Sequence, residues 1–108
     1  MIRHVVTFKF KAEHAEQHSA AASQLRATLE PLGSLVPGVR SLEIGIDDGS
    51  VEGHWDAVLI SVHDSADALA AYQVHPEHVA ALDVVASLVD MKSVVDYPVQ
   101  GPAAEPAQ

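Results

Sequence analysis

The sequence predicts an α+β fold of βαββαβ order, in which a four-stranded antiparallel sheet carries helices on one face. Four short segments alternate apolar and polar residues, two helix-forming stretches separate them, and 108 residues leave room for one domain. Aromatic residues make up only 5% of the chain, so aliphatic side chains must fill most of the core. We expect the domain to occupy residues 1–98, followed by a flexible Pro/Ala-rich tail over 99–108.

The first strand is predicted over residues 2–11, where successive side chains alternate between two faces. One face is apolar except for a single polar residue, and its members are Ile2, His4, Val6, Phe8 and Phe10. His4 is therefore expected to point toward the core.

A long helix is predicted over residues 12–34, which are rich in Ala, Glu, Gln and Leu. Pro31 and Gly33 are expected to end this helix. Its stripe follows helical spacing and consists of His18, Ala22, Leu25, Leu29 and Leu32.

The second and third strands are predicted over 39–47 and 54–63, joined as a hairpin by a wide loop. On the second strand, one face carries Leu42, Ile44 and Ile46. On the third strand, Val58, Ile60 and Val62 share one face, while the other carries Ala57, Leu59, Ser61 and His63.

The second helical stretch is expected to be broken in two. Asp64 or Ser65 can cap a helix over 65–74, which stops before Pro76 because proline disfavours helix in the preceding residue. Pro76 suits the first position of a further helix over 76–89. The stripe of that helix consists of His78, Leu82, Val85 and Val89, and a last strand is predicted over 91–97.

Composition excludes several functional classes. Six basic residues against fifteen acidic ones give a net charge of −9, which repels a nucleic-acid backbone. The lack of cysteine rules out disulfides, thiol catalysis and cysteine metal sites. No apolar run is long enough for a membrane span, and Met1 leads directly into a strand without a secretory leader. We therefore expect a cytoplasmic protein that binds neither nucleic acid nor membrane.

The predicted arrangement leaves one face of the sheet without helices, although both faces of the first strand carry apolar residues. Phe8 lies on one face and Val5 on the other. A second copy of the chain covering the bare face would remove this exposure. The sequence thus predicts a homodimer in which two sheets face each other to form a barrel.

Four segments of the chain resemble the stress-responsive A/B barrel (Dabb) family: IRHVVTFKFK, LVPGVRSLEIG, WDAVLISVHDSADALAAYQVHPEH and VVDYP. The resemblance covers residues 1–98, and YQVHPEH is its most specific part. It implies a ferredoxin-like monomer that pairs into a dimeric α+β barrel. It also implies an unassigned activity, because most members of that family have none assigned.

A few plant members of the family are polyketide cyclases, which run an aldol condensation in a pocket between sheet and helices. Their working tyrosine and histidine match Tyr72 and His78, and a histidine of their first strand matches His4. The resemblance therefore implies catalytic roles for these three residues. Some members also carry a metal ion near the dimer interface.

The residues themselves support such chemistry. Tyr72 precedes the helix break and His78 follows it, so both can reach one pocket. The positive end of a helix disfavours imidazolium, which should lower the pKa of His78 and leave a neutral general base. Tyr72 can donate to a carbonyl oxygen, and His4 can orient the ligand. We expect the remaining ligand contacts from His75, Val6, Phe8, Leu25, Leu29, Leu59 and Val89.

A purely structural interpretation stays open. In it, His75 caps a helix, His78 hydrogen-bonds Tyr72, and His4 is a satisfied core residue. Two departures also weigh against polyketide cyclisation. Aliphatic residues stand where the cyclases have pocket aromatics, and Ala57 occupies the position of a further pocket histidine.

We accordingly expect a homodimer that binds a small apolar or carbonyl ligand in a sheet–helix pocket. The alternative is a cofactor-free, polyketide cyclase-like or aldol-type lyase with His78 as base and Tyr72 as acid. A haem-binding or oxygenase-type barrel is a third hypothesis, but no spacing selects an axial histidine. No cofactor or metal is predicted, since His14 with His18, and the loop acids Asp47, Asp48 and Glu52, fit a solvated surface better.

Overall fold

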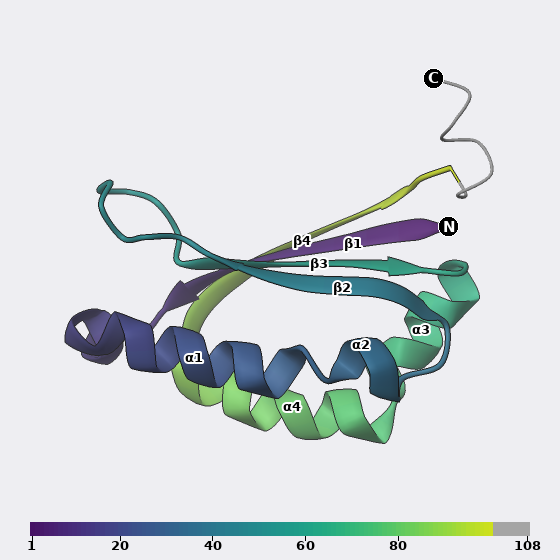
Figure 1. Ribbon diagram of the computed structural model, residues 1–108, viewed down its shortest axis with the longest axis horizontal. Coiled ribbons are helices and arrows are strands. Elements are labelled where there is room, and N and C mark those ends of the chain that lie inside the picture. Colours follow the sequence, from purple (N-terminus) through teal and green to yellow (C-terminus); the bar gives the residue numbers. More distant parts are fainter. Residues whose placement is uncertain (101–108) are drawn as a thin grey trace.

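The computed structural model describes residues 1–100, apart from the side chains of residues 14–16. Figure 1 shows one sheet with helices below it. The elements follow in the order β1 (Ile2–Phe10), a 3-10 helix (Ala12–Gln17), α1 (His18–Leu29), α2 (Leu32–Leu35), β2 (Val39–Ile46), β3 (Ala57–His63), α3 (Ala66–Val74), α4 (Pro76–Leu88) and β4 (Val89–Pro98).

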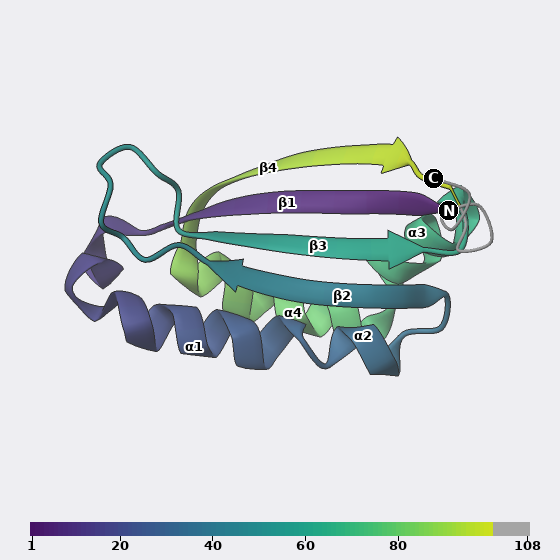
Figure 2. The same ribbon diagram turned by 45° about the horizontal axis from the view of Figure 1, so that its top comes forward.

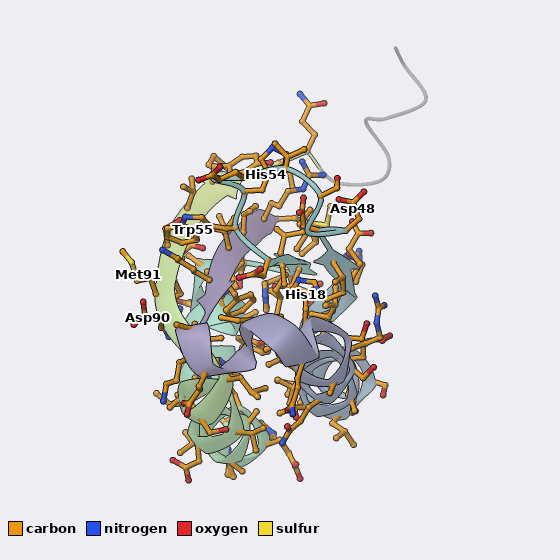
Figure 3. The ribbon with its side chains drawn as sticks, turned by 90° about the vertical axis from the view of Figure 1, so that its left-hand side faces the viewer. His18, Asp48, His54, Trp55, Asp90 and Met91 are labelled. Carbon is orange, nitrogen blue, oxygen red and sulfur yellow. The ribbon has the colours of Figure 1, made fainter. Side chains whose placement is uncertain are left out.

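The sheet confirms the predicted ferredoxin-like α+β fold. Its strand order is β2-β3-β1-β4, and each neighbouring pair is antiparallel. The helices all lie on one face, as Figures 1 and 2 show. Figure 3 looks from the end that carries the β2–β3 loop, where Asp90 and Met91 lie at the outer edge next to β4.

The core lies between the sheet and the helices. The helix-facing side of β1 carries the predicted buried residues, with Val6, Phe8 and Phe10 at most 6% exposed. His4 is also buried at 6% exposure, as expected from its place on that face. β3 contributes Ala57, Leu59, Ser61 and His63, while α1 contributes Ala21, Ala22, Leu25 and Leu29.

The first helical stretch differs from the single helix predicted over 12–34. It begins as a 3-10 helix, continues as α1 and stops at Leu29, and a separate turn of helix, α2, follows. The break comes at Pro31, which lacks the N–H that would bond to the preceding turn. Of the predicted stripe, Ala22, Leu25, Leu29 and Leu32 are buried, and His18 is half-buried.

Two strand boundaries also differ. β3 begins at Ala57 rather than at residue 54, because the His54 N–H bonds to the Val51 carbonyl in a turn. β4 is longer than the predicted 91–97 and pairs with β1 from Val89 to Pro98. Just beyond it, the Val99 N–H donates to the Met1 carbonyl at 2.9 Å. The tail predicted to be flexible lies outside the described residues from 101 onward.

The second sheet face has no helical cover, as predicted. We call it the bare sheet face; its members are Ser41, Glu43 and Gly45 of β2, Val58, Ile60 and Val62 of β3, Arg3, Val5, Thr7 and Lys9 of β1, and Met91, Ser93, Val95 and Tyr97 of β4. Val95 is 61% exposed and Tyr97 39% exposed on this face. Within residues 1–100, no helix is both long and apolar enough to cross a membrane.

Candidate functional site

The break between α3 and α4 determines how the site is built. Ser65 caps α3, since its side chain accepts the Ala68 N–H at 3.1 Å. His75 is extended, and its Nδ1 accepts the Glu77 N–H at 3.1 Å, so it caps α4. The chain therefore turns sharply at His75, which brings side chains from both helices against the same part of the sheet.

Tyr72 lies at the centre of a group of four rings. Its ring centroid is 4.6 Å from that of His78 and 4.8 Å from that of His63. The His4 ring lies 6.2 Å away, on the opposing strand β1. The structure thus brings together the three residues for which catalytic roles were predicted, and adds His63.

His78 is held by the backbone rather than by Tyr72. Its Nδ1 lies 3.0 Å from the Gln73 carbonyl oxygen. A carbonyl only accepts hydrogen bonds, so Nδ1 carries the proton and Nε2 of the neutral ring is a free acceptor. The structural interpretation in which His78 bonds to the Tyr72 hydroxyl is therefore not what the structure shows.

The pKa of His78 is lowered, in the predicted direction but for a different main reason. Burial is the largest cause, and the nearby His4 and Lys92 lower the pKa further. The hydrogen bond to Gln73 acts in the opposite direction and raises it. His78 is consequently neutral at pH 7, which is the form a general base requires.

Tyr72 is a protonated donor without a partner. Its side chain is 1% exposed, and burial raises its pKa to about 12. The hydroxyl makes no hydrogen bond to any residue within the described part of the chain. It is therefore able to donate to an oxygen of a bound molecule.

His4 has a partner that the sequence did not reveal. Its Nδ1 lies 2.5 Å from Asp96 Oδ1, on the adjacent strand β4. A carboxylate only accepts hydrogen bonds, so His4 Nδ1 carries a proton and donates it in a hydrogen bond to Asp96. The alternation of β4 could have indicated Asp96, since residues 92, 94 and 96 share the helix-facing side. Two adjacent valines, Val94 and Val95, hide that alternation in the sequence.

These groups line a cavity of about 120 Å³ between the sheet and the helices. Seven predicted site residues form part of its wall: His4, Val6, Phe8, Leu29, Leu59, Tyr72 and His78. The wall also includes five residues that were not named as ligand contacts: Gln73, Leu82, Val85, Lys92 and Val94. The wall thus combines the polar side chains of His4, Tyr72, Gln73, His78 and Lys92 with aliphatic side chains and Phe8.

Three predicted contacts lie outside this cavity. Leu25 is completely buried in the core behind it. His75 is the cap of α4. Val89 instead lines an adjoining groove of about 290 Å³ between α4 and β4, which shares Leu82, Val85 and Lys92 with the cavity wall.

His63 is a buried polar residue next to the cavity. It is 0% exposed, and its Nε2 lies 2.8 Å from the Ser61 hydroxyl. Its Nδ1 is buried without a hydrogen-bond partner among the residues of the described region. Burial is the main reason that the pKa of His63 is lowered, and the neighbouring His4 lowers it further.

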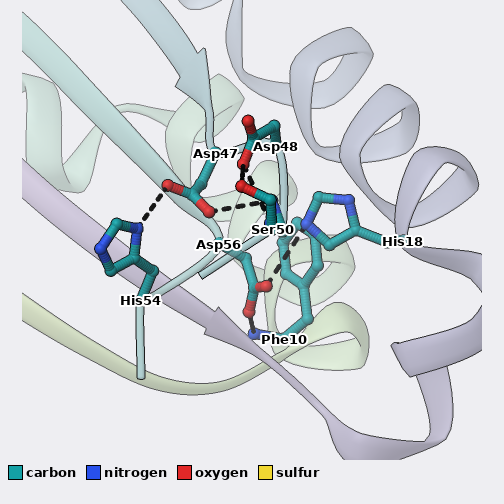
Figure 4. A network of polar contacts seen from close by, with 8 residues as sticks. Phe10, His18, Asp47, Asp48, Ser50, His54 and Asp56 are labelled. Carbon is teal, nitrogen blue, oxygen red and sulfur yellow. Dashed lines mark hydrogen bonds and ion pairs between the residues drawn. The ribbon is translucent and has the colours of Figure 1, made fainter. Parts of the chain in front are cut away.

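The β2–β3 loop forms a separate polar network at the far end of the sheet (Figure 4). Asp56 accepts the Phe10 N–H at 2.7 Å and lies 3.3 Å from His18 Nε2. Asp48 accepts two bonds from Ser50, which lower the pKa of its carboxyl. Asp47 and Asp48 thus accept hydrogen bonds from residues of their own loop, and no three His, Asp or Glu residues of the described chain form a possible metal site.

Comparison with solved structures shows the same fold in proteins of several organisms. A dimeric protein of unknown function and ferredoxin-like fold from Bacteroides fragilis NCTC 9343 is 28% identical, with a TM-score of 0.78 over 91% of this chain and 95% of that one. A dimeric ferredoxin-like protein of unknown function from Thermobifida fusca is also 28% identical, with a TM-score of 0.64 and coverage of 91% and 90%.

A more distant structure shares only the fold. Hydroxynitrile lyase from Passiflora edulis is 16% identical, with a TM-score of 0.74 over 92% of this chain and 93% of that one. No curated protein matches the chain. Residues 2–99 match the Stress responsive A/B Barrel Domain (Dabb). Because this match spans nearly all of the chain, the protein belongs to the stress-responsive A/B barrel (Dabb) family, the family that its sequence resembled.

Proposed function

We propose that the protein is a homodimer whose cavity binds a small, mainly apolar molecule that carries a carbonyl group. The observation that carries this proposal is the unbonded Tyr72 hydroxyl in the wall of a cavity that also has several aliphatic side chains. The hydroxyl has no hydrogen-bond partner within the described part of the chain, so a carbonyl oxygen of a bound molecule can accept its hydrogen bond. Val6, Leu59 and Leu82 offer apolar contact to the rest of such a molecule.

The size of the cavity limits the ligand. Its volume of about 120 Å³ is close to that of an engineered cavity of roughly 150 Å³ that binds benzene. A single ring or a short branched chain therefore fits the cavity itself. A longer chain would have to continue into the adjoining groove along α4.

Two observations support the homodimer. The similar proteins from Bacteroides fragilis and Thermobifida fusca are both described as dimeric. The bare sheet face also exposes apolar side chains that an identical face could cover, with Val5, Ile60 and Val62 at its centre. The cytoplasmic location predicted from the sequence remains part of this proposal.

Proton transfer at the same site is the second candidate, and the protonation state of His78 favours it. The free Nε2 can take a proton from the carbon next to a carbonyl group, while Tyr72 donates a hydrogen bond to the oxygen of the resulting enolate. The enolate carbon can then attack a second carbonyl, and the protonated His78 returns its proton to the new alkoxide. This would be a cofactor-free aldol-type lyase or cyclase acting on small carbonyl compounds.

Titration with cyclohexanone tests both candidates. We expect NMR signals of the Tyr72 and His78 rings to shift on binding. Tyr72→Phe should weaken binding about fivefold, since it removes one hydrogen bond of about 1 kcal/mol. His54→Gln, an exposed loop variant, is the control and should leave affinity unchanged. Unchanged ring signals at saturating cyclohexanone would contradict the proposed binding site.

The same sample in D₂O tests for catalysis. If His78 acts as a base, the hydrogens next to the carbonyl of cyclohexanone should exchange with solvent faster than in buffer alone. The exchange should be lost in His78→Gln, which retains a polar side chain but has no basic nitrogen. Exchange at the buffer rate in the original protein would exclude this proton transfer and leave a binding protein.

A further inference from the structure

Lys92 lies where the cavity meets the adjoining groove. It pairs with Phe8 across β1 and β4, on the helix-facing side of the sheet. It lines the cavity together with Tyr72 and His78, and it also lines the groove together with Val89. A molecule that occupies the cavity therefore passes close to this side chain.

Lys92 gives the cavity a charge opposite in sign to the net charge of the chain. The chain as a whole has a net charge of −9, yet the described wall of the cavity contains Lys92 and no aspartate or glutamate. Asp96, further along the same face of β4, already accepts a hydrogen bond from His4 Nδ1. Among the residues that the structure describes, no carboxylate forms an ion pair with Lys92. The cavity thus has a positive charge without a counter-ion.

The field of this charge reaches the polar end of the cavity. Lys92 is one of the residues that lower the pKa of His78, because a nearby positive charge disfavours a second one. A neutral His78 adds no positive charge, and Tyr72 adds a hydrogen-bond donor. The wall therefore suits a single negative charge, while its aliphatic part suits an apolar body.

Building on the proposed ligand-binding function, we propose that the cavity prefers a monoanionic carboxylate with a small apolar body over a neutral carbonyl compound, and that Lys92 is the residue that sets this preference. One oxygen of the carboxylate faces the Lys92 ammonium or the Tyr72 hydroxyl, and the ring or branched chain contacts Val6, Leu59 and Leu82.

Cyclohexanecarboxylate and cyclohexanecarboxamide are matched probes, because they share size and shape but differ in charge. We expect the carboxylate to bind about tenfold more tightly at low ionic strength, as is typical of a charge-assisted hydrogen bond. Raising the salt concentration should reduce this preference, since Lys92 is exposed to solvent. Affinities are measured by NMR titration of the Tyr72 and His78 ring signals.

Lys92→Gln tests the assigned residue, and Lys9→Gln is its control. Both variants remove one positive charge from neighbouring strands, but Lys9 lies on the bare sheet face, away from the cavity. The preference for the carboxylate should disappear in Lys92→Gln and persist in Lys9→Gln. Equal affinities for the two probes in the original protein, or a preference that survives Lys92→Gln, would overturn the inference while cyclohexanone binding still supported the proposed function. If neither probe nor cyclohexanone shifts the ring signals, both proposals fail.

Discussion

At the scale of single residues, burial has opposite effects on the two groups that face the cavity. It raises the pKa of Tyr72 and lowers that of His78, so both are neutral at pH 7. Neutral Tyr72 retains a proton to donate, and neutral His78 retains a nitrogen that accepts one. Burial is the first cause of the shift at His78, ahead of the neighbouring charges.

His63 leads to a prediction about stability and pH. Its pKa in the folded protein lies below the ordinary value of 6.5, so the unfolded chain binds a proton more readily than the folded one. The contribution of neutral His63 to the free energy of unfolding should be fully present above pH 6.5. It should be lost as the pH falls from there toward the lowered pKa. Each such histidine lowers the free energy of unfolding by at most about 1.4 kcal/mol for each pH unit below 6.5. The pKa of His78 is lowered too, so His78 acts in the same direction.

Urea denaturation between pH 7.5 and 5 measures this loss. His63→Phe should flatten the decline, because phenylalanine has no proton to gain and removes a buried Nδ1 that has no described partner. His54→Gln in the exposed loop should leave the decline as it is. A pH profile that His63→Phe does not alter would show that Asp96 and Asp64, which raise the pKa of His63, compensate for its burial.

At the scale of elements, the turn at His75 connects helix capping to the site. It lets α3 end and α4 begin within a single residue, and this places Tyr72 and His78 side by side. Only the polar Nδ1 of His75 takes part, by accepting the Glu77 N–H. His75 thus supports the site through the backbone, although its side chain does not line the cavity.

Substitution of His75 separates capping from ligand contact. His75→Ala should lower the free energy of unfolding by about 1 kcal/mol, because it removes an N-cap acceptor. His75→Asn should retain most of the stability, since asparagine is a preferred cap. Chemical denaturation of the two variants gives the comparison. Loss of ligand affinity in both variants at unchanged stability would instead show that the imidazole contacts the ligand.

Much of this fold could be predicted because its signals are local. Period-two alternation identified β1, β2 and β3, and the His75-Pro76 pair located the helix break. The single helix predicted over 12–34 was wrong because helix-forming composition continues across residues that adopt a 3-10 turn. The exact ends of β4 were missed because they depend on pairing with β1, which is set by the whole sheet.

The site was predictable only in part, for a related reason. Tyr72 and His78 are close in sequence, so one motif reveals both of them. Asp96 and Lys92 reach the site through the β1–β4 register, across more than 80 residues of chain. Leu25 was predicted as a ligand contact because it shares a stripe with Leu29, but helix spacing alone does not tell which residue of a stripe borders a cavity.

At the scale of the whole molecule, the bare sheet face is the side of the sheet that no helix of the described chain covers (Figure 2). Its central strands carry Val5, Val58, Ile60 and Val62, which are half-buried side chains. Charged and polar residues are also present, since Arg3 donates to the Tyr97 hydroxyl at 3.1 Å. Such a mixture of an apolar centre and a polar rim is common in protein interfaces.

Ile60→Glu tests the proposed dimer. Sedimentation equilibrium of the original protein should give twice the 11.4 kDa mass of one chain. A glutamate at the centre of the interface should weaken association by at least roughly 100-fold, because an unpaired buried charge costs about 3 kcal/mol or more. Val74→Glu introduces the same charge on an exposed part of α3 and should leave the dimer intact. A stable monomer at micromolar concentration in the original protein would contradict the proposed assembly.

The cavity wall draws its strand residues from the helix-facing side of the sheet, opposite the proposed interface. Pairing through the bare sheet face would therefore leave the two cavities apart, each open to solvent on the outside of its own protomer. Filling one would leave the other unaffected, so saturation should follow a simple hyperbola with one molecule bound per chain. The assembly would then supply stability to each subunit without making their ligand sites cooperative.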